Sequence, residues 1–99
     1  MFLIVTYDAE QRRTEKFRKL LAEYLEHEQN SVFMGTITPS LRRRLLTRLR
    51  RLVKPGERVT EFVAANRHNI EITRLGRDSR SGPASETPLA RHLCDHRVI

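Results

Sequence analysis

The chain begins with an uninterrupted apolar run at positions 1–5, followed by two good strand formers, Thr6 and Tyr7. A continuous apolar run of this length, extended by such residues, predicts a central β-strand that is buried on both faces. Asp8 follows where that strand must end. A central strand is a rigid support, so we expect the carboxylate of Asp8 at a fixed position from which it can still reach solvent.

A first helix is predicted over residues 11–26, where apolar side chains recur at helical spacing. Asp8 and Gln11 also have the spacing of a capping box, which would allow Asp8 to act simply as the N-cap of that helix. The other interpretation gives its carboxylate a chemical role. From the residues alone, both interpretations remain open.

The middle of the chain predicts a strand followed by a second helix. Residues 28–38 are the strand, and Gly35 suggests that it is bent or split. Thr38 and Pro39 have the residue types of an N-cap and a first helical position. They are followed over residues 39–53 by leucines at helical spacing, which predict the buried face of this helix.

The last elements complete an α+β pattern. Residues 58–65 and 70–75 predict a hairpin around a polar loop. The element order predicts a sandwich with one mostly antiparallel sheet and two helices on one face. We expect residues 1–75 to form this domain. Residues 76–88, rich in Gly, Ser, Pro and charge, predict a flexible linker. The more apolar residues 89–99 predict a docking tail that could add a strand to a partner sheet.

Arginine dominates the charge of the chain. It holds 19 Lys and Arg against 12 Asp and Glu, a net charge of +7, and 16 of the 19 cations are arginine. Because arginine binds phosphate in a bidentate manner, nucleic acid is the expected partner, ahead of an anionic membrane. The predicted second helix has six arginines and no acidic residue. The alternative is a solvated surface that only maintains solubility. The predicted nucleic-acid contacts are Arg12, Arg13, Lys16, Arg42, Arg43, Arg44, Arg48 and Arg51.

Other patterns exclude several protein classes. Cys94 is the only cysteine, which rules out an intrachain disulfide framework and fits a reducing cytoplasm. No apolar run approaches the ~20 residues of a membrane span, so we expect a soluble, cytoplasmic protein. The glycines are isolated, which excludes a Gly-rich phosphate loop. His92, Cys94 and His96 match no usual zinc spacing.

Two separated motifs resemble those of the small CRISPR-associated adaptation protein, the dimeric partner of the spacer integrase that is often labelled an endoribonuclease. The first motif is VTYD at residues 5–8, followed by Arg12 and Arg13, and the second is NSVFMG at residues 30–35. The Leu-rich second helix and the predicted hairpin follow in the order of that family. The resemblance covers about residues 1–75, whereas the tail matches poorly.

This resemblance implies a ferredoxin-like fold and a twofold homodimer. In such a dimer the Asp8 residues of the two chains face each other and can hold Mg²⁺ or another divalent cation such as Mn²⁺. Mg²⁺ needs only one or two carboxylates beside phosphate oxygens and water, so a symmetric pair suffices where one aspartate does not. The ion would polarise a phosphate and activate water for phosphodiester hydrolysis. The resemblance also implies that Ser31 lies beside the site and that Phe33 helps to set the dimer interface.

These observations lead to one main interpretation of function and two alternatives. The chain is interpreted as a homodimeric component of CRISPR adaptation, or spacer acquisition, that binds DNA or RNA and bridges integrase subunits. It would also be a metal-dependent endonuclease whose catalytic residue is Asp8. The first alternative is a non-catalytic nucleic-acid-binding scaffold, in which Asp8 caps the first helix or steadies the dimer. The second is a toxin-like ribonuclease of the same fold.

Overall fold

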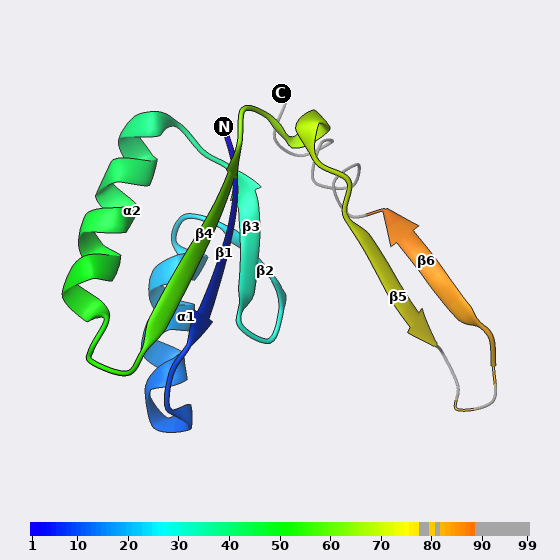
Figure 1. The fold of residues 1–99 in the computed structure, drawn as a ribbon, viewed down its shortest axis with the longest axis horizontal. Helices are drawn as coiled ribbons and strands as arrows, with labels where there is room; N and C mark the ends of the chain where they lie inside the picture. Colours follow the sequence, from blue (N-terminus) through cyan, green and yellow to red (C-terminus); the bar gives the residue numbers. More distant parts are fainter. Residues whose placement is uncertain (78–79, 81, 89–99) are drawn as a thin grey trace.

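A computed structural model describes residues 1–77, 80 and 82–88 of the chain (Figure 1). Its main body is a four-stranded antiparallel sheet with two helices against one face (Figure 1). The strand order is β2-β3-β1-β4, which places the N-terminal strand inside the sheet. The predicted α+β, ferredoxin-like architecture is confirmed. The elements of this body are β1 (Phe2–Asp8), the 3₁₀-helix η1 (Gln11–Arg13), α1 (Thr14–Ala22), β2 (Glu26–Gln29), β3 (Val32–Thr36), α2 (Pro39–Leu52) and β4 (Arg58–Ala64).

β1 is buried on both faces, as its apolar run predicts. Leu3 and Val5 are fully buried in the main core, which fills the space between the sheet and the helices. On the opposite face, Phe2 packs with Met34 in a smaller cluster that the helices do not cover. We call this second side of the sheet the open face. Burial on both faces fixes the direction of the strand and therefore the place where it ends.

The predicted strand over residues 28–38 is in fact two strands, β2 and β3, joined by a tight turn. Asn30 lies in that turn with a φ of 40°, a left-handed conformation that Asn tolerates better than most residues. The irregularity of the ladder falls between His27 and Gln29, not at Gly35. Gly35 instead lies in regular register opposite Leu3 of β1. The extra strand completes the order strand, helix, strand, strand, helix, strand.

The first helix is shorter than predicted, and Asp8 does not cap it. Glu10 and Arg13 occupy the N-cap positions of η1 and α1, and neither position has a capping side chain. Asp8 is still part of β1, so two residues separate it from η1. α1 ends at Ala22, and the chain then turns to enter β2. The capping interpretation of Asp8 is therefore wrong.

α2 begins as predicted at Thr38, whose Oγ1 accepts a hydrogen bond from the backbone N–H of Leu41 at 3.2 Å. Pro39 takes the first helical position. The helix buries Leu45 and Leu49 against the core. Among the described residues, no helix combines the length and the apolar character that crossing a membrane requires.

The predicted hairpin between residues 58–65 and 70–75 is wrong. After β4, the chain forms a short 3₁₀-helix, η2 (Arg67–Asn69), and Ile70 and Ile72 then pack against the open face. β5 (Thr73–Arg77) pairs with β6 (Ala84–Pro88) and not with β4. The two strands form a separate arm beside the body (Figure 1), so β4 remains an edge strand.

The arm also changes the predicted division of the chain. β6 lies within the stretch predicted as a flexible linker, and the predicted boundary at residue 75 falls inside β5. Arg74 of β5 forms an ion pair with Glu28 of β2, which joins the arm to the main sheet. The predicted docking tail, residues 89–99, lies outside the described residues.

Candidate functional site

Asp8 is the last residue of the central strand, and its side chain is exposed. It lies in register with Arg58 at the start of β4. Asp8 opens into a pocket of about 380 Å³ at this end of the sheet. We call it the Asp8 pocket. Its walls are the β1–η1 connection on one side and the turn between α2 and β4 on the other, and the lining residues are Asp8, Ala9, Glu10, Arg12, Arg13, Lys54, Pro55, Gly56 and Glu57.

Three carboxylates line the Asp8 pocket, but arginines bind two of them. Glu10 accepts a hydrogen bond from Arg12 Nε at 2.8 Å. Glu57 accepts two from Arg13, from Nε at 2.5 Å and from Nη2 at 3.1 Å. The bond from Arg13 holds the pKa of Glu57 below its ordinary value. Within the described part of the chain, Asp8 is the one carboxylate of this pocket for which no ion pair is found.

The side chains of the pocket supply only some of the oxygen ligands that a divalent cation needs. Mg²⁺ and Mn²⁺ prefer oxygen ligands, and Mg²⁺ retains several of its waters. The described residues contain no group of three His, Cys, Asp or Glu side chains placed to hold a metal ion. One chain therefore offers the Asp8 carboxylate and the site needs further oxygen ligands. A second carboxylate and phosphate oxygens would complete a set suited to these ions.

Ser31 lies beside the end of β1, in the turn between β2 and β3. Its carbonyl oxygen accepts a hydrogen bond from the N–H of Tyr7, the neighbour of Asp8, at 3.3 Å. Phe33, in contrast, is fully buried in the main core. Its ring stacks on His27 with the centroids 4.5 Å apart. Because the Phe33 side chain has no exposed surface, the predicted interface role cannot be a direct contact of this side chain with a second chain.

The arginines of α2 fall into two groups. Arg42 donates to both carboxylate oxygens of Glu61 on β4, at 2.8 and 2.5 Å. Arg48 binds Glu23, just after α1, at 2.7 and 3.1 Å, and also donates to the hydroxyl of Tyr24. This ion pair lowers the pKa of Glu23. Sequence reasoning missed these acceptors because they come from other elements.

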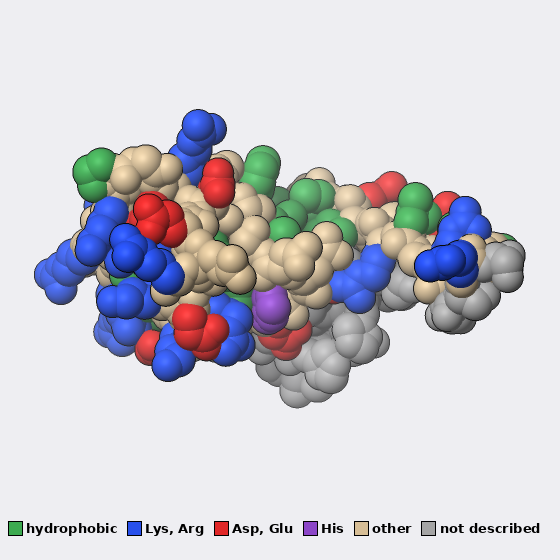
Figure 2. Space-filling model, turned by 90° about the horizontal axis from the view of Figure 1, so that it is seen from below, with side chains coloured by type: hydrophobic (Ala, Val, Ile, Leu, Met, Phe, Trp, Pro, Cys, Tyr) green, Lys and Arg blue, Asp and Glu red, His purple; other side chains and the backbone are tan. Residues whose placement is uncertain are grey.

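The second group consists of exposed arginines for which the described residues show no ion pair: Arg43, Arg44, Arg50 and Arg51. Lys16 on α1 is exposed as well. Figure 2 shows cationic side chains gathered at the end of the body where the two helices lie, with acidic side chains between them. Of the predicted nucleic-acid contacts, Arg13, Arg42 and Arg48 are held by carboxylates, Arg12 is bound to Glu10 but remains largely exposed, and the others are open to solvent.

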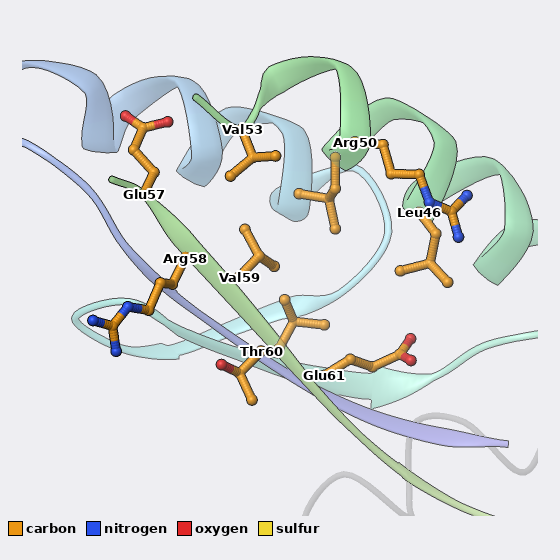
Figure 3. A pocket seen from close by; sticks show the side chains of 10 residues that line it. Leu46, Arg50, Val53, Glu57, Arg58, Val59, Thr60 and Glu61 are labelled. Carbon is orange, nitrogen blue, oxygen red and sulfur yellow. The ribbon is translucent and has the colours of Figure 1, made fainter. Parts of the chain in front are cut away.

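A larger pocket of about 460 Å³ lies between α2 and β4 (Figure 3). Leu46, Val53 and Val59 extend into it, whereas the side chain of Thr60 points to the other side of β4 (Figure 3). Four charged residues also line it: Arg50, Glu57, Arg58 and Glu61. Its two carboxylates, Glu57 and Glu61, are bound by Arg13 and Arg42, so the Asp8 pocket remains the candidate site.

The fold and this site together define a class. The strand order and the two helices on one face are those of a ferredoxin-like α+β sandwich. The sandwich carries an exposed carboxylate at the end of its central strand and a cationic surface over its helices. Within that class, the chain belongs to the family of CRISPR associated protein Cas2, whose family model matches residues 1–69. The resemblance carried by the two sequence motifs is thereby confirmed.

Relatives and solved structures agree with this family. A protein of Haloferax volcanii named CRISPR-associated endoribonuclease Cas2 is 34% identical over 76 residues, which is 77% of this chain and 88% of the relative. A protein of Thermodesulfovibrio yellowstonii named CRISPR-associated endoribonuclease Cas2 3 is 38% identical over 76 residues, which is 76% and 86% of the two chains. A Cas2 crystal structure superposes with a TM-score of 0.72 at 34% identity and covers 84% of this chain and 94% of that one.

Proposed function

We propose that this protein is a component of CRISPR adaptation that binds nucleic acid as a homodimer and bridges integrase subunits. We further propose that it cleaves phosphodiester bonds with a divalent cation held between two Asp8 carboxylates. Relatives named as endoribonucleases support a nuclease activity in general. The observation that carries the proposal is that Asp8 is exposed at the end of the central strand, in a pocket whose other carboxylates are bound by arginines.

A second copy of the chain is needed because one aspartate is too few ligands. The open face and its edge supply a surface for such a copy. Phe62 of β4 lies beside Ile4 in the sheet register and is 53% exposed. An exposed aromatic side chain next to a partly buried apolar cluster favours covering by another molecule. A twofold dimer would place a second Asp8 in the assembly, and with it a second carboxylate.

In this proposal the residues of the pocket have different roles. The two Asp8 carboxylates hold the ion, and a bound Mg²⁺ would supply Lewis-acid polarisation of the scissile phosphate and activation of water. Lys54 lines the same pocket and is exposed, and Arg12 is largely exposed with its bond to Glu10 made from Nε, so both can bind the phosphates that flank the cleaved bond. The pairing of Glu10 and Glu57 with arginines reduces the repulsion that their charges would exert on the nucleic acid.

The test is Asp8→Asn with RNA and DNA substrates, with and without Mg²⁺. The substitution keeps the shape of the side chain and removes the charge that attracts the cation. We expect cleavage to fall at least ~100-fold, while the dimer mass and the affinity for nucleic acid stay within about twofold. Cleavage that survives the substitution unchanged would show that Asp8 does not carry the chemistry. Spacer integration that proceeds normally with this variant would favour the scaffold alternative.

The exposed arginines of α2 are tested separately. We expect the double variant Arg44→Gln/Arg51→Gln to weaken binding of duplexes of different sequence by similar factors, because phosphate contacts carry no sequence information. The slope of log affinity against log salt should decrease by up to about 2, one for each lost contact. Binding is measured by titration at several salt concentrations.

The matched control is Arg42→Gln/Arg48→Gln, which removes the same charge from arginines already bound by Glu61 and Glu23. We expect a smaller change in affinity from this pair of substitutions. Equal effects of the two double variants would show that net charge matters and that the exposed arginines of α2 have no special role.

A further inference from the structure

The ion pair between Arg13 and Glu57 is among the least exposed charged contacts of the described chain. The side chains of Arg13 and Glu57 are 11% and 6% exposed. Each of the guanidinium atoms Nε and Nη2 binds one oxygen of the carboxylate, and the guanidinium also lies 5.8 Å from the centre of the Phe17 ring. Such a pair keeps a fixed geometry, unlike an exposed pair, because its partners are packed on several sides.

This ion pair joins three segments of the chain. Arg13 Nη2 donates to the carbonyl oxygen of Leu52, the last residue of α2, at 2.8 Å. Glu57 Oε1 accepts from the backbone N–H of Lys54 at 2.9 Å, which closes the turn after the helix. The N–H of Arg13 itself binds the carbonyl of Glu10 at 2.8 Å. The end of α2, the α2–β4 turn and the β1–η1 connection are thus held together.

Both residues of the ion pair are close to Asp8, one across the sheet and the other along the chain. Glu57 precedes Arg58, which lies opposite Asp8 in the β1–β4 register. Arg13 ends η1, which follows Asp8 after two residues. These segments are the two walls of the Asp8 pocket. We propose that Arg13 and Glu57 are positioning residues, which hold the walls of the pocket so that Asp8 is presented to a divalent cation.

This inference rests on the proposed metal-dependent function, and it assigns Arg13 a role other than the phosphate contact predicted from the sequence. It also differs from a purely electrostatic role. A charge effect alone predicts opposite results for the two partners. Loss of Glu57 would leave a positive charge near the cation and weaken its binding, whereas loss of Arg13 would leave a negative charge and strengthen it. A positioning role predicts weaker binding in both cases.

The experiment measures Mn²⁺ binding by calorimetry at neutral pH, without nucleic acid, for the whole chain and its variants. We expect Glu57→Gln and Arg13→Gln each to weaken Mn²⁺ binding about tenfold, the size of effect typical for residues that support a metal ligand. The control is Glu61→Gln, which breaks another bidentate ion pair, the one between Arg42 of α2 and Glu61 of β4. It should leave the Mn²⁺ affinity within about twofold of the wild type. Thermal melting checks that each variant is folded, and Arg13→Lys replaces Arg13→Gln if the latter unfolds.

Each outcome decides between defined alternatives. Tighter binding by Arg13→Gln, or unchanged binding by Glu57→Gln, overturns the positioning role. An equal loss in the Glu61→Gln control also overturns it, because the effect would then be a general loss of stability. If wild type binds Mn²⁺ and Asp8→Asn does not, the proposed metal site survives even when the positioning role fails. If wild type binds no Mn²⁺, both proposals fail together.

Discussion

Arg13, Arg42 and Arg48 each place two guanidinium nitrogens on one carboxylate, whereas Arg44 and Arg51 are exposed without an ion pair in the described structure. The residue type is the same, but the physical situation is different. A guanidinium bound to a carboxylate must give up that partner before it can bind phosphate, while an exposed one exchanges only water. The number of arginines therefore overstates the number of cations available to a nucleic acid.

The pH dependence of stability follows from Glu57. Its hydrogen bond from Arg13 lowers its pKa in the folded state from the ordinary value of 4.5. A group with a lowered folded-state pKa contributes stability that is present above the unfolded pKa and is lost as pH falls through the folded pKa. We expect the urea midpoint of wild type to fall more steeply between about pH 5 and about pH 3 than that of Glu57→Gln. Parallel curves for the two proteins would contradict this prediction.

At the scale of elements, α2 shows how local residue types determine where a helix begins. Thr38 accepts a hydrogen bond from the N–H of Leu41, one of the backbone donors that a helix start leaves unpaired. We expect Thr38→Ala to lower the free energy of unfolding by about 1 kcal/mol, as measured by urea denaturation. Ser40→Ala is the matched control, because Ser40 is exposed within the first turn and should change stability by less than about 0.5 kcal/mol.

The strand elements show the opposite case, in which local patterns do not decide the pairing. Residues 70–73 alternate apolar and polar side chains, and residues 70–75 predict a strand beside β4. In the structure Ile70 and Ile72 use their apolar side chains to cover the open face. The strand that follows pairs with β6, in a stretch whose composition predicts no regular structure. A short polar strand such as β6 is recognisable only through its partner.

At the scale of the whole molecule, two features are available for contact with a second chain. β4 is an edge strand, and Phe62 on the open face is 53% exposed. We expect the wild-type protein to have twice the monomer mass of 11.6 kDa in analytical ultracentrifugation. Phe62→Glu should shift it to the monomer, because burying the introduced charge in an apolar interface is strongly unfavourable.

Leu41→Glu is the control for that experiment. Leu41 is 39% exposed and apolar but lies on α2, away from the open face. The Leu41→Glu variant should therefore keep the dimer mass. A monomeric wild type, or a Phe62→Glu variant that still has the dimer mass, would refute the proposed interface on the open face, and the first result would also remove the second Asp8 that the metal site needs.

The sequence by itself determined the central strand, the position of Asp8 at its end, the start of α2 at Thr38 and the family. These features depend on residues that are adjacent or a few positions apart, so the pattern that causes them is visible in the chain. The sequence also predicted that Asp8 would reach solvent, but it did not predict which residues line the pocket around it.

Tertiary structure alone decided which charges are available and which segments pair. Arg42, Arg48 and Arg13 find carboxylates 19, 25 and 44 residues away, and no local pattern records those distances. No local pattern predicts the arm either, because β5 and β6 are strands that pair with each other. Ion pairs and ladders depend on where the folded backbone brings side chains together, and that arrangement is set by the burial of the whole core.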